Sequence, residues 1–199
     1  MRPGRALAAA LVGAAFLLAA CDKLLSPKTP FKAIDVTGAP MGGDLRLTDH
    51  NGTPRSLADF RGKVVVVVFG YTQCPDVCPT TLADFSSAVK KLGPDGSQVQ
   101  VLFVTVDPKR DTPELLRQYV PAFDPGFLGL YGDAAATSKV TKDFRIFAQE
   151  RPGKTAGAYT VDHTAQSFVY DRAGRLRLVI GYGTSPESIA SDLRILLNS

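Results

Sequence analysis

The 199-residue chain lacks several features that mark whole classes of proteins. It has no run of lysine and arginine and no ladder of aromatic residues, which argues against binding to nucleic acid. It has no internal repeat and no low-complexity tract, so its length fits one domain that can bury a core. The net charge of +4 includes Arg2 and Arg5 near the N-terminus, so the remaining chain is less basic than the sequence pI of about 9.0 suggests.

Cysteine and histidine are also scarce, with three cysteines and two histidines. Cys74 and Cys78 form a C-x-x-x-C pair, which follows the valine run of residues 64–68 and precedes a helical pattern. A buried strand that leads through paired cysteines into a helix builds a reactive or metal-binding dithiol. The N-terminus of the helix is expected to favour the thiolate over the thiol. The function is therefore expected to lie here.

The first twenty residues predict an export signal that is not part of the fold. Arg2 and Arg5 precede an apolar run that is short for a transmembrane helix of ~20 residues. The run ends in LLAAC, where Cys21 resembles the cysteine of a bacterial lipobox, and this resemblance implies cleavage before Cys21 and its lipidation. An ordinary secretory signal and an uncleaved anchor are the alternatives. The proline-containing segment 21–40 is expected to tether a domain of residues 41–199 to the membrane.

The hydrophobic pattern beyond residue 41 predicts alternating strands and helices. Strands are expected at 45–47, 64–69, 99–106, 159–161, 166–170 and 176–181; helices are expected at 56–62 (helix or turn), 79–92, 112–120 and 134–147, and after Ser185. Two core strands joined by a helix favour a parallel pair, whereas the turn DRAG (171–174) joins two later strands into an antiparallel hairpin. The predicted fold is therefore α/β and thioredoxin-like, with a mixed central sheet, helices on both faces, and the cysteine pair beyond the carboxyl end of a core strand.

Three interpretations of Cys74 and Cys78 are open: a structural disulfide, a thiol–disulfide redox pair, and a metal site. A disulfide across so short a loop would stabilise the fold little. His163, expected in a loop at the dithiol end of the sheet, favours a metal site. The alternative is a loop histidine whose hydrogen bonds are satisfied within the protein and which binds no metal. Two thiolates and one imidazole suit copper, whereas structural zinc needs a fourth ligand. His50, in the polar turn DHNG, is expected at the surface with no role.

Three blocks of the sequence, in the same order and spacing, resemble the Sco/SenC family. The blocks are FGYTQCPDVCP (69–79), VTVDPKRDTPE (104–114) and VDHTAQSFVYD (161–171), and the resemblance covers about residues 40–199. It implies a membrane-tethered, thioredoxin-like protein that binds Cu(I) or Cu(II) and delivers copper to the CuA centre of cytochrome c oxidase. By position, it implies Cys74, Cys78 and His163 as the copper ligands.

The resemblance also places Asp107 near the site as an accessory acidic residue; a loop aspartate that caps a turn is the alternative. Gln73 stands where many members have histidine, so a role for that side chain in redox tuning or partner contact stays open. The implied partners are the CuA-bearing subunit of the oxidase and other periplasmic copper chaperones. The implied location is the bacterial cell membrane, with the domain facing the periplasm on its lipid anchor.

The resemblance implies a carrier rather than an enzyme, although the reduced cysteine pair could also reduce cysteines of the acceptor. A thiol–disulfide oxidoreductase of the thioredoxin type is the main alternative. Such enzymes have C-x-x-C and a cis-proline beside the dithiol, where this chain has Asp162 and His163. A peroxiredoxin-type peroxidase would need threonine or serine in place of Tyr71. An exported thioredoxin-like binding module is the remaining alternative.

Overall fold

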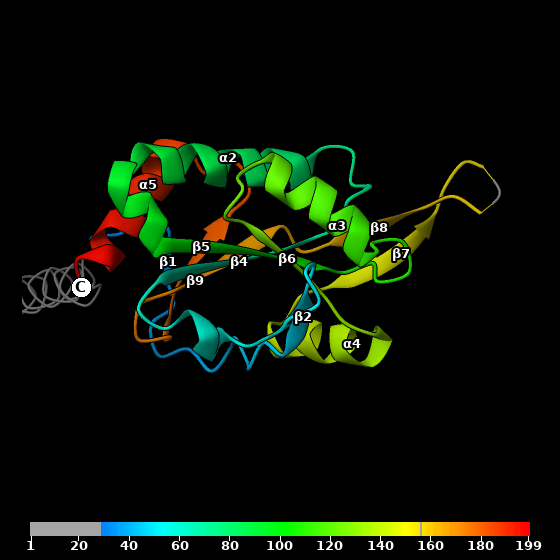
Figure 1. The fold of residues 1–199 in the computed structure, drawn as a ribbon, viewed down its shortest axis with the longest axis horizontal. Coiled ribbons are helices and arrows are strands. Elements are labelled where there is room, and N and C mark those ends of the chain that lie inside the picture. Colours follow the sequence, from blue (N-terminus) through cyan, green and yellow to red (C-terminus); the bar gives the residue numbers. More distant parts are fainter. Residues whose placement is uncertain (1–28, 156) are drawn as a thin grey trace, which may run out of the picture. The chain divides into compact units, whose positions relative to one another are not determined.

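The computed structural model describes residues 29–155 and 157–199, so the predicted export signal and Cys21 lie outside the described residues. Its central sheet has eight strands in the order β1-β10-β9-β4-β5-β6-β2-β3 (Figure 1). The strands of this sheet are β1 (Ile34–Asp35), β2 (Leu47–Asp49), β3 (Pro54–Arg55), β4 (Val64–Gly70), β5 (Val99–Thr105), β6 (Leu128–Tyr131), β9 (Gln166–Tyr170) and β10 (Leu176–Gly181).

A separate two-stranded ribbon is formed by β7 (Ala148–Pro152) and β8 (Tyr159–His163). The helices are α2 (Val77–Lys91), α3 (Pro113–Tyr119), α4 (Ala134–Asp143) and α5 (Pro186–Leu197), and short 3-10 turns are η1 (Leu57–Phe60), η2 (Gly93–Gln98) and η3 (Val120–Ala122). Within the described residues, none of the helices has the length and hydrophobicity needed to cross a membrane.

Strand β4 lies in the middle of the fold, and all seven of its residues are buried. Successive side chains of a strand point to opposite faces, so β4 contributes to two cores. Val64, Val66 and Val68 pack with residues of α2, α3 and α5. Val65 and Val67 pack with residues of η1 and α4 on the other face. Figure 1 shows these two helical layers, and the predicted mixed sheet with helices on both faces is confirmed.

The strand pairing also follows the predicted pattern. β4 and β5 are parallel, in the register Val64↔Val99 to Gly70↔Thr105, and α2 connects them. β9 and β10 form the expected antiparallel hairpin, and β9 pairs antiparallel with β4. Because β4 and β5 are parallel and in register, their carboxyl ends lie side by side, and the loops that follow Gly70 and Thr105 meet at one edge of the sheet.

The helix predicted over 134–147 ends earlier than expected, at Asp143. Arg145 adopts the left-handed conformation, with φ of 54°. The Ile146 N–H donates to the Thr141 carbonyl at 2.7 Å, and the Arg145 N–H donates to the Lys142 carbonyl at 3.0 Å. These two bonds make the Schellman motif that commonly ends a helix, with arginine where glycine is usual. The sequence carried no glycine to mark this end, so the prediction was wrong there.

Four strands were not predicted, and one histidine was misplaced. β3, β6 and β7 were missed, and β1 lies in the segment that we expect to act as a tether, where it pairs with β10. His50, expected at the surface, is only 4% exposed. Its Nδ1 atom accepts a hydrogen bond of 3.0 Å from the Gly129 N–H, and its carbonyl accepts two from Arg117. His50 therefore joins β2, β6 and α3, and the surface prediction was wrong.

Candidate metal centre

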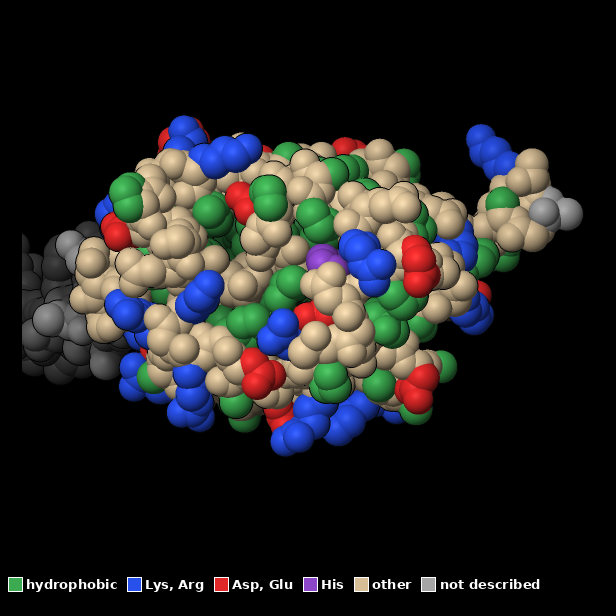
Figure 2. All heavy atoms as spheres, viewed as in Figure 1, with side chains coloured by type: hydrophobic (Ala, Val, Ile, Leu, Met, Phe, Trp, Pro, Cys, Tyr) green, Lys and Arg blue, Asp and Glu red, His purple; other side chains and the backbone are tan. Residues whose placement is uncertain are grey.

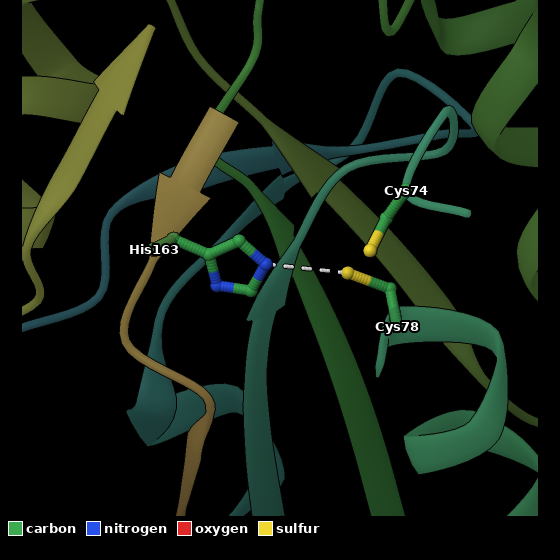
Figure 3. Close-up of side chains that lie close together, drawn as sticks. All are labelled: Cys74, Cys78 and His163. Carbon is green, nitrogen blue, oxygen red and sulfur yellow. Dashed lines mark hydrogen bonds between the residues drawn. The ribbon is translucent and has the colours of Figure 1, made fainter. Parts of the chain in front are cut away.

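The cysteine pair lies where β4 gives way to α2, beyond the carboxyl end of the strand (Figure 3). Cys74 lies in the connecting loop and is partly exposed, whereas Cys78 lies in the first turn of α2 and is buried. Both thiols are free. The C-x-x-x-C spacing thus places one cysteine partly at the surface and the other inside the protein.

His163 approaches the cysteines from the opposite side (Figure 3). It is the last residue of β8, where the sequence predicted a loop between two strands. Its Nε2 atom lies 3.3 Å from Sγ of Cys78. The ligand atoms of Cys74, Cys78 and His163 all lie within 4.8 Å of one another, and within the described residues they are the one group of His, Cys, Asp or Glu that could hold a metal ion. The structure therefore brings together the three residues that the family resemblance implied as ligands.

The tautomer of His163 follows from its other nitrogen. Nδ1 lies 3.1 Å from the Thr164 carbonyl oxygen, which can only accept a hydrogen bond. The proton of the neutral ring is therefore on Nδ1, and the lone pair of Nε2 faces Cys78. Burial lowers the pKa of His163 below its ordinary value of 6.5, which favours this neutral form. Metal-binding histidines use the same arrangement, in which one nitrogen is fixed by a carbonyl and the other is free to coordinate.

The environment of Cys78 differs from the sequence expectation. Burial raises the pKa of the Cys78 thiol, and a backbone hydrogen bond from Tyr71 offsets this only in part. The N-terminus of α2 was expected to favour the thiolate, but removal of the sulfur from water is the larger effect. In the metal-free protein Cys78 is therefore a thiol, and a cation that replaces its proton would stabilise the buried sulfur.

Gly70, the last residue of β4, makes room for the Cys78 sulfur. A Cβ atom at position 70 would lie 2.8 Å from Cys78 Sγ and 2.7 Å from Cε2 of Phe103. Both distances are shorter than real Cβ contacts, so only glycine fits without a shift of its neighbours.

Asp107 follows β5 and lies at the same edge of the sheet, as the resemblance implied. It is 3% exposed and forms an ion pair with Arg110. Its Oδ1 atom accepts a hydrogen bond of 2.8 Å from the hydroxyl of Tyr159, the first residue of β8. Asp107 does not belong to the group of candidate ligands. Its hydrogen bond with Tyr159 supports the strand that carries His163.

Asp111, four residues further on, supports the cysteine loop. It is 2% exposed and accepts hydrogen bonds from the hydroxyls of Thr72 and Thr105, each at 2.6 Å. It also accepts from the Thr72 N–H at 3.1 Å. Burial raises the pKa of Asp111, and these hydrogen bonds act in the opposite direction. Asp111 therefore fixes the loop two residues before Cys74.

Sequence reasoning missed Asp111, Arg110 and the two tyrosines that surround the site. Tyr71 packs edge-on against the His163 ring, with centroids 5.9 Å apart, and Tyr159 contacts Asp107. The block VDPKRDTPE contained a signal, since Asp107, Arg110 and Asp111 are spaced as on one helical turn.

Figure 2 shows that a histidine (purple) and hydrophobic side chains (green) reach the surface near the middle of one face.

The sequence of the chain matches one known protein family over most of its length. The sequence pattern of the SCO1/SenC family matches residues 35–198. The chain belongs to the SCO1/SenC family. The resemblance inferred from the three sequence blocks is thereby confirmed.

The chain is also similar to individual Sco proteins over most of its length. The mouse mitochondrial SCO2 homolog is 37% identical over 154 residues, which cover 76% of this chain and 60% of that protein. The chain thus spans about three fifths of this curated relative. The SCO2-like protein of Rickettsia felis is 32% identical over 187 residues, which cover 92% of this chain and 90% of that protein.

A solved structure of Bradyrhizobium japonicum ScoI with copper bound is 41% identical and has a TM-score of 0.73. The match covers 79% of this chain and 99% of that one. The thioredoxin-like fold predicted for this Sco protein is therefore confirmed. The relative binds copper, and the present chain has two thiols and one imidazole within reach of a single ion.

Proposed function

We propose that this Sco protein is a membrane-tethered copper metallochaperone that delivers copper to the CuA centre of cytochrome c oxidase. Cys74, Cys78 and His163 hold the metal. The observation that carries this proposal is the approach of their ligand atoms to within 4.8 Å of one another. The copper bound to the related ScoI of Bradyrhizobium japonicum supports the choice of metal.

The chemistry of the three ligands fits copper in both oxidation states. Thiolates are soft ligands that satisfy Cu(I), and imidazole adds a ligand that Cu(II) prefers. Two sulfurs and one nitrogen leave the ion with low coordination. Because Cys74 is partly exposed, a ligand of the acceptor can approach the ion from the surface. Copper then passes by exchange of ligands and is not released as a free ion.

The location follows from the N-terminal sequence. We propose that residues 1–20 are removed as a signal, that Cys21 is lipidated, and that the following segment to residue 40 holds the domain at the membrane, facing the periplasm. The acceptor is then the CuA-bearing subunit of the oxidase, and other periplasmic copper chaperones are further partners. β1 begins at Ile34, so the part of the tether that is free of the sheet is shorter than the sequence alone suggests.

Copper titration of the reduced, full-length protein in detergent tests the proposal. Anaerobic Cu(I) titration against a competing chelator should give one copper per chain. Addition of Cu(II) should give strong thiolate-to-copper charge-transfer bands. Cys74→Ser and Cys78→Ser should each abolish tight binding, because each removes one of two thiolates. Tight copper binding that survives either substitution would contradict the assignment of the ligands.

A thiol–disulfide oxidoreductase is the second candidate, because both cysteines are free and their sulfurs lie close together. Enzymes of the thioredoxin type place a cis-proline against the dithiol. The part of the chain that the structure describes has no cis peptide bond, and His163 takes the position facing the sulfurs. Rapid reduction of a test disulfide by a protein that shows no charge-transfer bands with Cu(II) would favour the oxidoreductase.

A further inference from the structure

Arg110 lies between the two elements that carry the candidate ligands, and its guanidinium contacts both. Its Nη1 atom donates a hydrogen bond of 3.2 Å to Oε1 of Gln73, the residue directly before Cys74. The same Nη1 donates a hydrogen bond of 2.8 Å to the backbone carbonyl of Tyr159. Tyr159 begins β8, the strand that ends at His163. One side chain thus joins the cysteine loop to the histidine strand.

The guanidinium is held in a single orientation. Its Cζ atom lies 3.5 Å from the centroid of the Tyr159 ring and 5.6 Å from that of Tyr71. Its Nε atom donates to the carboxylate of Asp107, and the arginine side chain is only 18% exposed. A planar, forked cation can make these contacts together, and a lysine ammonium cannot. Tyr71 extends the connection, because its ring also packs edge-on against His163.

This connection matters because the strand that carries His163 is not part of the central sheet. Strands β7 and β8 pair with one another in a separate ribbon, and all five residues of β7 are exposed. Gln166, three residues after His163, already pairs within the central sheet, but β8 itself makes none of that sheet's hydrogen bonds, so its start at Tyr159 is held by other contacts. The contacts of Tyr159 with Asp107 and Arg110 hold β8 against the loop that follows β5.

We propose that Arg110 is a positioning residue that sets the distance between His163 and the cysteine pair. This inference rests on the proposed copper-binding function. Two thiolates can hold Cu(I) with little help from the imidazole, whereas Cu(II) needs the nitrogen ligand. Arg110 therefore controls how strongly the site holds Cu(II) relative to Cu(I), although it does not touch the metal position.

The test compares Arg110→Met with the unmodified full-length protein in detergent. Methionine keeps an unbranched apolar chain about as long as the aliphatic part of arginine but removes every hydrogen bond of the guanidinium. Cu(II) affinity should fall by about tenfold or more, as for residues that orient metal ligands. Cu(I) affinity should change much less, and the charge-transfer bands with Cu(II) should shift. Arg110→Lys should restore only part of the Cu(II) affinity, because its point charge can pair with Asp107 but cannot also reach both other acceptors.

Arg151→Met is the matched control. Arg151 lies on the same ribbon, but it is half-exposed and pairs with Asp162 at the surface. Its removal should leave the ratio of Cu(II) to Cu(I) affinity unchanged. If Arg110→Met does not fold, Gln73→Leu removes the hydrogen bond of Arg110 to the cysteine loop, and Tyr159→Phe removes the hydrogen bond that holds β8 to Asp107. Each should shift the same ratio in the same direction.

Two results would overturn the proposal: an unchanged Cu(II) affinity in folded Arg110→Met, or an equal loss of Cu(I) and Cu(II) affinity. A measurement on the metal-free protein separates these results from a failure of the copper function itself. The NMR signals of the His163 ring should move in Arg110→Met and stay in place in Arg151→Met. A wild-type protein that binds no copper, with these shifts present, would contradict the metallochaperone assignment and leave Arg110 as the residue that positions His163.

Discussion

Sγ of Cys78 lies 3.3 Å from Nε2 of His163, although 85 residues separate the two in the chain. The Thr164 carbonyl holds the proton of the imidazole on Nδ1, so the thiol proton of Cys78 can be donated to the lone pair of Nε2. Loss of that proton leaves two Lewis bases pointing at each other inside the protein. A soft cation between them satisfies both, which is why the pair is suited to metal binding.

His163→Ala should weaken Cu(II) binding far more than Cu(I) binding. The substitution removes the nitrogen ligand and leaves both thiolates, so we expect a loss of about tenfold or more for Cu(II) and a smaller loss for Cu(I). Competition titrations with a chelator for each oxidation state measure both affinities. Equal losses for the two ions would contradict the division of roles between sulfur and nitrogen. His163→Gln, which retains a polar side chain of similar size, serves as a second variant.

Gly70→Ala should destabilise the protein and disturb the cysteine site. The new methyl group would lie 2.8 Å from Cys78 Sγ and 2.7 Å from Phe103 Cε2, and one of them must move. Overpacking of this kind costs about 1–3 kcal/mol of unfolding free energy. Urea unfolding of the metal-free protein measures the cost, and Cu(I) titration measures the effect on the site.

Gly181→Ala is the control for this experiment. Gly181 ends β10, and a Cβ atom there meets nothing within 4 Å. We expect a change of less than about 0.5 kcal/mol at this exposed position. If Gly70→Ala were as mild as Gly181→Ala, the tight packing between β4 and the Cys78 sulfur would be refuted.

His50 should make the stability of the protein depend on pH. Burial lowers the pKa of His50 below the value of 6.5 that it has in the unfolded chain. The neutral ring accepts a hydrogen bond from the Gly129 N–H. The unfolded chain therefore binds more protons below pH 6.5, and the unfolding free energy falls as pH decreases from 6.5 through the folded pKa. Above that range the contribution of His50 is complete.

His50→Asn removes the titrating ring and keeps an oxygen that can accept the Gly129 N–H. Between about pH 7.5 and about pH 5.5, the wild-type protein should lose more unfolding free energy than the variant. Urea unfolding at both pH values measures this difference. His163 is present in both proteins, so its own contribution to the pH dependence of stability cancels in the comparison. Identical pH slopes would show that His50 does not titrate on unfolding.

Cys21 should carry a lipid in the mature protein. The sequence LLAAC ends the apolar run at this cysteine, and we expect cleavage before it and acylation of its N-terminus. Mass spectrometry of the N-terminal peptide from the native membrane fraction checks both. A mature N-terminus at another residue, or Cys21 without an acyl mass, would show that the signal is of another kind. Cys21→Ser should then release no additional protein from the membrane.

The strands and helices of the central layers could be predicted because their residues have a strong local pattern. The valine run of β4 is buried on both faces and matches its predicted span within one residue. The hairpin of β9 and β10 was predicted with its observed bounds, since the DRAG turn marks it. β7 has no such pattern, because its residues Ala148–Pro152 are all exposed. The end of α4 was missed because Arg145, and not glycine, adopts the left-handed conformation there.

The sequence by itself determined the family and the α/β layers, and it singled out Cys74, Cys78 and His163 as the candidate ligands. Each of these depends on short motifs and local periodicity. Only the tertiary structure decided that the imidazole reaches the buried sulfur, that Gly70 makes room for it, and that Arg110 joins the two elements. These are contacts between segments far apart in the chain. They depend on how the ribbon of β7 and β8 lies against the loops after β4 and β5, and no local pattern of residues encodes that placement.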